Sequence, residues 1–271
     1  MPPSQPSRAP VYPKGYPSPP AANQRPPTRG CLIWRVRSAC IGQTPLIIGA
    51  VSLAAPESKG PLLRERLRTA RLYFVCDARP HGEDPEALLL AALGGGVDIV
   101  QLREKELSRA EVERAASTYR RVCDTYSALF IVNDDPELAR ACDADGVHVG
   151  KHAEVAAARE LLGPDAIVGL STHGPEELDA ANPLPVDYVA VGPIWETPTK
   201  PGRPAIGLEP ISYAAAHSAH PFFGIGGVDP GNAAQVTAAG AERLCVVRAI
   251  HEAADPRAAA EALRQGVAPG G

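Results

Sequence analysis

From about residue 70 onward, short runs rich in β-branched and aromatic residues alternate with longer runs rich in alanine and leucine. Eight of the short runs are typical of buried strands, and a predicted helix follows each of them. This rhythm predicts an α/β fold of parallel strands, a closed (β/α)8 TIM barrel, with an open doubly wound sheet as the alternative. The predicted strands are Leu72–Cys76, Ile99–Leu102, Leu129–Val132, Gly146–Val149, Ala166–Leu170, Tyr188–Val191, Phe222–Ile225 and Leu244–Val247.

The first sixty residues differ from the rest in composition. Residues 1–30 hold about a third of the 29 prolines, mixed with Ser, Gln and Arg. Such a segment cannot bury enough apolar surface to offset the entropy of ordering it. We therefore expect residues 1–60 to be a disordered proline-rich extension and residues 61–271 to form the barrel. Met1 is the only methionine, so a natural start further along the chain would use a non-methionine codon. A start near residues 51–62 would leave much of the extension outside the native enzyme.

Charge and cysteine usage limit the partners and the compartment. A net charge of −4 and a pI of about 6.0 give no electrostatic reason to expect nucleic acid or an anionic membrane as a partner. No apolar stretch reaches the roughly 18 residues of a membrane span. None of the six cysteines forms a C-x-x-C pair, so reduced thiols in a cytoplasmic protein are expected rather than a disulfide or zinc framework. The sequence leaves the oligomeric state open, including a homo-oligomer.

Polar side chains gather where the predicted strands end. The second strand runs into Gln101-Leu102-Arg103-Glu104-Lys105, and alternation puts Gln101, Arg103 and Lys105 on one face. Two cations and an amide at the mouth of a barrel suit an oligophosphate. A surface ion-pair cluster with Glu104 is the alternative explanation.

The third strand ends in Asn133-Asp134-Asp135. A carboxylate at a strand's carboxyl end is a suitable hard oxygen ligand for Mg²⁺. Asp135 stands just before a predicted helix and is expected to cap it, which leaves Asp134 as the candidate for the metal.

The fourth and fifth strands add an imidazole and hydroxyls. His148 alternates with valines, and we expect a hydrogen-bonded core histidine rather than a ligand. The fifth strand is followed by Ser171, Thr172 and His173 at the same rim. No G-x-S-x-G elbow is present, which argues against a nucleophilic serine.

Further anion-binding features follow the last three strands. The loop after the sixth strand carries Thr197, Thr199 and Lys200, and the seventh strand ends in Gly226-Gly227. Backbone N–H groups of a glycine turn can hold a phosphate, and the loops after strands seven and eight are the recurrent phosphate site of such barrels. The rim thus carries two predicted anion sites, a side-chain site with Mg²⁺ on strands two, three and six and a backbone site on strands seven and eight. Two sites predict two phosphorylated substrates, or one long one.

Taken together, these motifs over residues 70–265 resemble the thiamine-phosphate synthase (thiamine-phosphate pyrophosphorylase) family. The motifs that carry the resemblance are Gln101-Leu102-Arg103-Glu104-Lys105, Asn133-Asp134, Asp145-Gly146-Val147-His148-Val149-Gly150, Gly169-Leu170-Ser171-Thr172-His173, Val191-Gly192-Pro193, Thr197-Pro198-Thr199-Lys200, Ile225-Gly226-Gly227 and Val246-Val247-Arg248-Ala249-Ile250.

The resemblance implies a Mg²⁺-dependent transferase that joins 4-amino-2-methyl-5-hydroxymethylpyrimidine diphosphate to a thiazole phosphate. The products are thiamine phosphate and pyrophosphate. The resemblance implies that the pyrimidine diphosphate is held by Gln101, Arg103, Lys105, Asn133 and Lys200, with Mg²⁺ on Asp134 and Ser171 near the leaving group. By the same resemblance the thiazole phosphate is held by Thr197, Thr199, Gly227, Val247 and Arg248, the last three through backbone N–H groups. Arg103, Lys105, Ser171 and Lys200 are expected to be catalytic.

One position departs from the family pattern. Where family members carry an aspartate as a second Mg²⁺ ligand, this chain has Ala153, followed by Glu154. Mg²⁺ keeps several waters and needs only one or two carboxylates. We therefore expect weaker Mg²⁺ dependence, with Glu154 or water in the vacated place.

Two other functions fit parts of the pattern. A thiazole tautomerase of the same fold would use His173 as its acid–base catalyst, but it has no need of the diphosphate-binding cations. A non-catalytic sensor of thiazole or thiamine phosphate is suggested by the missing carboxylate at Ala153.

Overall fold

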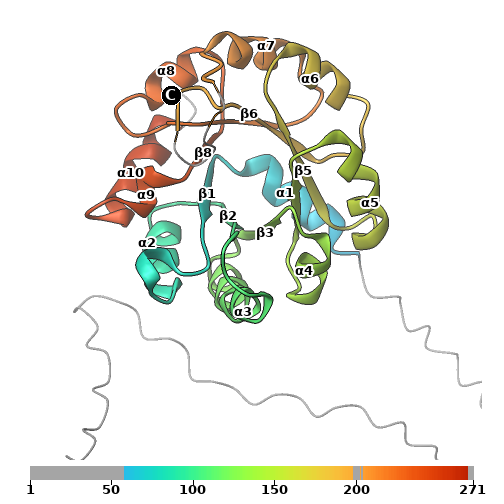
Figure 1. Ribbon diagram of the computed structural model, residues 1–271. Helices are drawn as coiled ribbons and strands as arrows, with labels where there is room; N and C mark the ends of the chain where they lie inside the picture. The colour runs from blue at the N-terminus through green and yellow to red at the C-terminus, as the bar shows by residue number, and fades with distance from the viewer. Residues whose placement is uncertain (1–57, 198–201, 203, 268–271) are drawn as a thin grey trace, which may run out of the picture. The chain divides into compact units, whose positions relative to one another are not determined.

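Eight parallel strands close into a barrel in the computed structural model, which describes residues 58–197, 202 and 204–267 (Figure 1). The chain divides into two units, Met1–Leu53 and Ala54–Gly271, and every described residue belongs to the second. The strands are β1 (Leu72–Cys76), β2 (Ile99–Leu102), β3 (Leu129–Asn133), β4 (Gly146–Val149), β5 (Ile167–Thr172), β6 (Tyr188–Val191), β7 (Phe222–Ile225) and β8 (Leu244–Val246).

The first and last strands pair with each other, which closes the sheet. Strand β8 pairs with β7 and also with β1, where Leu72 lies opposite Leu244. The barrel therefore has no exposed edge. The predicted TIM barrel is confirmed, and the open doubly wound sheet is excluded.

Helices surround the barrel and alternate with its strands (Figure 1). They are α1 (Gly60–Thr69), the 3-10 turn η1 (Pro80–Gly82), α2 (Glu86–Gly94), α3 (Arg109–Tyr126), α4 (Pro136–Ala141), α5 (His152–Leu162), α6 (Pro175–Ala181), α7 (Glu209–His217), α8 (Ala233–Ala238), α9 (Arg248–His251) and α10 (Pro256–Gly266). No helix in this part of the chain has both the length and the apolar character needed to cross a bilayer.

Strand alternation divides the core into two layers. In β1, Leu72, Phe74 and Cys76 pack outward against the helices. Tyr73 and Val75 belong to a second cluster inside the barrel. This is the side-chain period of two expected for any strand, and it decides which residues can reach the barrel's interior.

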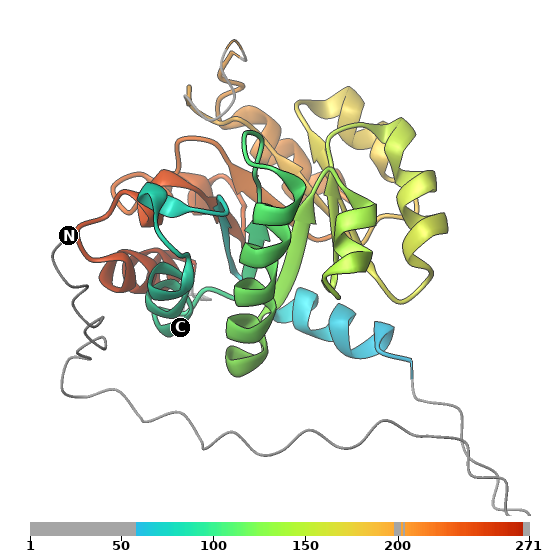
Figure 2. The same cartoon turned by 60° about the horizontal axis from the view of Figure 1, so that its bottom comes forward.

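Helix α1 covers the end of the barrel where the strands begin (Figures 1 and 2). Its Leu63 and Leu67, one turn apart, are buried in one cluster with Leu129 and Ile167, the first residues of β3 and β5. Each buried leucine contributes about 1.5–3 kcal/mol. Helix α1 was not predicted, because three leucines among arginines at the edge of an irregular segment carry little periodicity.

Some predicted boundaries need correction. Strand β5 runs Ile167–Thr172 rather than Ala166–Leu170, since Ser171 and Thr172 continue the ladder opposite Ala190 and Val191. Strand β8 ends at Val246, and the short unpredicted helix α9 begins at Arg248. Both changes lie where the strands meet the cavity described next.

Candidate active site

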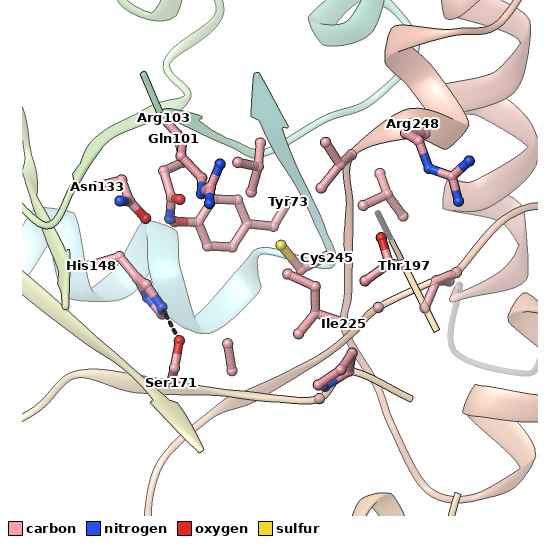
Figure 3. A pocket seen from close by; sticks show the side chains of 18 of the residues that line it. Tyr73, Gln101, Arg103, Asn133, His148, Ser171, Thr197, Ile225, Cys245 and Arg248 are labelled. Atoms are coloured by element: carbon pink, nitrogen blue, oxygen red, sulfur yellow. Dashed lines mark hydrogen bonds between the residues drawn. The ribbon is translucent and has the colours of Figure 1, made fainter. Parts of the chain in front are cut away.

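A cavity of about 960 Å³ opens at the carboxyl ends of the strands (Figure 3). Every predicted site residue within the described part of the chain lines it: Gln101, Arg103, Lys105, Asn133, Asp134, Ser171, Thr197, Gly227, Val247 and Arg248. Two further predicted residues, Thr199 and Lys200, lie outside the described residues.

The predicted residues come from two sides of the cavity. Figure 3 shows Gln101, Arg103 and Asn133 on one side and Thr197 and Arg248 on the other. The first side is built by β2 and β3, and the second by the segments that follow β6 and β8. The cavity is therefore bordered by two groups of candidate anion-binding residues.

A chain of hydrogen bonds runs across the cavity floor. The amide of Gln101 donates to the hydroxyl of Tyr73 at 2.6 Å, and the hydroxyls of Tyr73 and Tyr188 are 2.9 Å apart. The Tyr188 hydroxyl lies 3.1 Å from Nδ1 of His148, whose Nε2 lies 3.0 Å from Oγ of Ser171. All five side chains are buried. Five strands, β1, β2, β4, β5 and β6, thus contribute one residue each to a continuous polar network.

Burial keeps the two tyrosines of this network protonated. It raises the pKa of Tyr73 and of Tyr188 well above the usual value, because a phenolate inside the barrel would lose its hydration. Both therefore act as neutral hydroxyls at any physiological pH. His148 is the hydrogen-bonded core histidine that the sequence predicts, and it also lines the cavity.

The carboxylate of Glu104 is turned toward the backbone rather than toward the neighbouring cations. It accepts from the N–H groups of Lys105 at 2.7 Å and Glu106 at 2.8 Å. Burial alone would raise the pKa of Glu104, but the backbone N–H groups of Glu106, Lys105 and Ala78 outweigh it and lower the pKa. Glu104 thus shapes the β2–α3 loop, while Arg103 and Lys105 line the cavity. This arrangement favours the anion-binding interpretation over the ion-pair cluster.

Asp134 follows β3 and lines the cavity, where its carboxylate is a candidate metal ligand. Its backbone has a φ of 58°, its N–H donates to the carbonyl of His148 at 2.8 Å, and its Oδ2 accepts from the Asn133 amide at 2.7 Å. The next carboxylate, Asp135, caps α4 through the N–H of Leu138 at 2.7 Å, as predicted. One cavity-facing carboxylate beside an amide fits a Mg²⁺ ion that takes its other ligands from phosphate and water.

The β4–α5 segment provides no second carboxylate ready for a metal. Ala153 is exposed in the first turn of α5. Glu154 lines the cavity, but its carboxylate accepts from the N–H of Lys151 at 3.1 Å and lies 3.9 Å from the Lys151 ammonium. Glu154 is therefore engaged in capping its own helix.

Glycine is required at the other side of the cavity. Gly226 and Gly227 have φ values of 104° and 68°, a region that side-chain-bearing residues rarely adopt. A Cβ on Gly226 would lie 2.4 Å from Cα of Pro193, and one on Gly227 would lie 2.8 Å from Cβ of Trp195. The β7–α8 loop thus packs closely on the segment after β6, and its backbone lines the cavity.

His173, the residue expected for a tautomerase, is engaged away from the cavity. Its Nδ1 is 2.7 Å from Oε2 of Glu177, and its N–H donates to the same oxygen. It is not among the described residues that line the cavity.

Sequence reasoning missed two residues of the floor network, Tyr73 and Tyr188. Both lie in apolar runs, which predict only that these residues belong to strands. Strand alternation could have indicated their position. Tyr73 points into the barrel like Val75, two residues on, and Tyr188 begins a strand opposite Gly169. A Cβ on Gly169 would meet the Tyr188 ring at 2.1 Å, so this glycine makes room for the tyrosine.

A closed parallel barrel with a cavity at the carboxyl ends of its strands defines a TIM-barrel protein, and the candidate anion-binding residues line that cavity. The family model described as thiamine monophosphate synthase matches residues 72–250, and the chain belongs to this family.

Two curated relatives and one solved structure support the assignment to this family. The thiamine-phosphate synthase of Thermobifida fusca is 48% identical over 206 residues, which cover 75% of this chain and 94% of that protein. That of Acidothermus cellulolyticus is 46% identical over 201 residues, 73% of this chain and 95% of that protein. The structure of thiamine phosphate pyrophosphorylase from Pyrococcus furiosus has a TM-score of 0.67 and 32% identity, and covers 76% of this chain and 97% of that one.

Proposed function

We propose that this chain is a thiamine-phosphate synthase, which joins the pyrimidine diphosphate to a thiazole phosphate and releases pyrophosphate. The observation that carries the proposal is the layout of one cavity, with Arg103 and Asn133 on one side and Thr197 and Arg248 on the other. Lys105 and Gly227 also line this cavity. A substrate pair with a phosphate group at each end suits such a cavity, because each end meets its own anion-binding groups. Family membership supports the same assignment.

Each predicted residue then has a place in the proposal. The pyrimidine diphosphate is assigned to Gln101, Arg103, Lys105, Asn133 and Lys200. The thiazole phosphate is assigned to Thr197, Thr199, Gly227, Val247 and Arg248. For Thr199 and Lys200, which lie outside the described residues, the assignment rests on the family resemblance alone.

The proposed reaction requires that the two reactants be positioned and that the charge of the leaving diphosphate be stabilised. It does not require a general base. The diphosphate departs first, and the thiazole nitrogen captures the resulting pyrimidinylmethyl cation. Arg103 and Lys105 stabilise the charge that grows on the leaving group. Anchoring a phosphate at each end of the cavity holds the two reactants in line and converts a bimolecular encounter into a local one.

The floor network gives Ser171 a defined proton direction. When Gln101 donates to Tyr73, the single hydroxyl proton of Tyr73 is directed to Tyr188, and that of Tyr188 to Nδ1 of His148. His148 is then neutral with its proton on Nε2, and it donates to Ser171. The hydroxyl proton of Ser171 is left to point into the cavity, where it can donate to the departing diphosphate.

Mg²⁺ is the proposed cofactor, and Asp134 is its proposed protein ligand. When bound, the ion neutralises charge on the diphosphate oxygens. Asn133 orients the Asp134 carboxylate through its 2.7 Å hydrogen bond. Since Glu154 caps α5, waters and substrate oxygens are left to complete the coordination.

The proposed metal site is tested by restoring a carboxylate. Ala153→Asp is expected to lower the Mg²⁺ concentration that half-saturates turnover and to tighten Mg²⁺ binding measured calorimetrically with pyrophosphate present. Ala157→Asp is the control, because it adds the same charge at another exposed position of α5. If Ala153→Asp tightens neither measurement, Ala153 does not occupy the place of a second ligand.

The cytoplasm is the proposed compartment. The cysteines of the described residues, Cys76, Cys123, Cys142 and Cys245, are all free thiols. Burial raises the pKa of Cys123 to about 12, which keeps this thiol protonated. Free thiols rather than disulfides are typical of a reducing compartment.

An assay with both substrates decides between the proposed function and its rivals. Pyrophosphate release that requires both substrates identifies a synthase. Tautomerisation of the thiazole without the pyrimidine would identify an isomerase instead. Tight binding without any turnover would identify a sensor.

A further inference from the structure

Three potential metal ligands meet beside the barrel rim, in a cluster that the proposed reaction does not use. Cys76 is the last residue of β1, Asp77 follows it, and His251 ends α9. The side chain of Cys76 packs on the outer, helix-facing layer of the core, whereas Val75 lines the cavity. The cluster is therefore separate from the candidate Mg²⁺ site at Asp134. No sequence motif marks it, because the fold brings together residues far apart in the chain.

The geometry suits one metal ion. The thiol sulfur, a carboxylate oxygen and a ring nitrogen of these residues all lie within 4.8 Å of one another. Nε2 of His251 is 3.4 Å from Oδ2 of Asp77. For ligand bonds of about 2.0–2.1 Å, two ligands of a tetrahedral ion lie roughly 3.3 Å apart, close to the separation observed.

The ring nitrogen of His251 lacks a hydrogen-bond partner. Nε2 is buried and makes no hydrogen bond among the described residues, even with Asp77 so near. A buried polar atom without a partner costs free energy, and native structures rarely leave one unexplained. A metal ion bound between His251 and Asp77 would satisfy it.

Neighbouring groups hold Asp77 and His251 in place. The His81 ring lies beside the His251 ring, with centroids 4.5 Å apart and planes inclined by 37°, and its Nε2 lies 2.9 Å from the carbonyl oxygen of His251. Oδ1 of Asp77 accepts from the N–H of Arg79 at 3.1 Å, which leaves Oδ2 directed at His251. Outer contacts of this kind orient the ligands of protein metal sites.

We propose that Cys76, Asp77 and His251 form a binding site for a zinc-type divalent transition-metal ion. A thiolate, a carboxylate and a neutral imidazole together neutralise a divalent charge, and sulfur and nitrogen donors favour Zn²⁺ or Co²⁺ over Mg²⁺. The sulfur–metal bond forms as the thiol releases its proton to solvent. The ion would tie the end of α9 to the end of β1, and a water molecule would complete its coordination.

Cobalt binding tests the site without any enzyme assay. The full-length chain is stripped of metal with a chelator, kept reduced and titrated with Co²⁺, followed by Zn²⁺ competition. Because Cys31 and Cys40 lie outside the described residues, the titration is made in a Cys31→Ser, Cys40→Ser background. We expect one equivalent of Co²⁺ with a thiolate-to-cobalt charge-transfer band, displaced by Zn²⁺ and unaffected by excess Mg²⁺.

Variants then assign the ligands. His251→Gln and Asp77→Asn are expected to weaken binding at least tenfold, and Cys76→Ser to abolish the charge-transfer band. Cys123→Ser, a buried thiol on α3, is the matched control and should keep the band. Asn at position 77 can still accept from Arg79, so this variant separates lost ligation from lost folding. Absence of the band in the parent, or unchanged affinity in both His251→Gln and Asp77→Asn, would overturn the proposal.

Discussion

At the scale of single residues, the candidate site depends on which side chains face the cavity and on how they are hydrogen-bonded. The rim residues could be predicted because strand alternation fixes which side chains face the barrel's mouth: Gln101 and Arg103 follow from parity alone. The floor hydrogen bonds could not, because their partners are distant in sequence. Tyr73 and Tyr188 are 115 residues apart, and a tyrosine in an apolar run is typical of core. Only the closed barrel brings them together.

Breaking the floor network should misdirect the Ser171 hydroxyl. Tyr188→Phe removes the link between Tyr73 and His148, and we expect kcat/KM to fall about tenfold. Stability should fall by about 1–3 kcal/mol, because buried polar groups lose a partner. In a Ser171→Ala background the same change should cost little further activity, as a double-mutant cycle would measure. Tyr213→Phe, which removes an exposed hydroxyl from Asp179, is the control; equal losses in both backgrounds would contradict the network's role.

The Arg103 guanidinium should act mainly on the leaving group. Arg103→Ala is expected to lower kcat/KM at least tenfold, about 1.4 kcal/mol, while the affinity for thiazole phosphate is retained. Steady-state kinetics with each substrate varied measures this. Arg121→Ala is the control, because Arg121 forms an exposed ion pair with Glu86. An unchanged kcat/KM for Arg103→Ala would remove this residue from the site.

At the scale of elements, the predicted strands were close to the observed ones, and their ends carried the errors. Long helices such as α3 were predictable from their periodic apolar face and their Ser108 capping box. The four-residue α9 was not, since one turn of helix has no measurable period. The extra length of β5 came from pairing with β6, a tertiary effect that overrides the polarity of Ser171 and Thr172.

The β7–α8 loop offers a test of the backbone side of the cavity. Gly227→Ala puts a Cβ 2.8 Å from Trp195 at a φ of 68°, and we expect KM for thiazole phosphate to rise at least tenfold. Gly163→Ala is the matched control, because Gly163 has a φ of 78° but nothing within 4 Å of its Cβ position. Both changes should cost about 1–3 kcal/mol of stability. If both raise KM equally, the loop has no special role in binding.

At the scale of the molecule, the two ends of the barrel have different tasks. The strand starts are closed by α1, which buries Leu63 and Leu67, and the strand ends hold the cavity. The barrel as a whole was predictable because eight repeats of one pattern admit few architectures. Its closure by α1 was not, because the helix lies at the boundary predicted for the extension, residues 1–60.

Two truncated forms should distinguish the contribution of the extension from that of α1 to stability and activity. We propose that the extension is dispensable: deleting residues 1–57 should leave Tm and kcat/KM unchanged. Deleting residues 1–69 removes α1 and should destabilise the barrel by about 3–6 kcal/mol, since two buried leucines are lost. Thermal and denaturant unfolding measure both. Equal stability of the two truncated forms would contradict the role of α1.

Simultaneous binding of two anions would show whether the cavity holds two separate phosphate sites. Calorimetry would titrate Mg²⁺-pyrophosphate into protein already saturated with thiazole phosphate. If separate groups around one cavity hold the two phosphate-bearing ends, pyrophosphate should bind at one equivalent with an affinity within about threefold of that without thiazole phosphate. Displacement of thiazole phosphate by pyrophosphate would show a single shared anion site and would contradict the account.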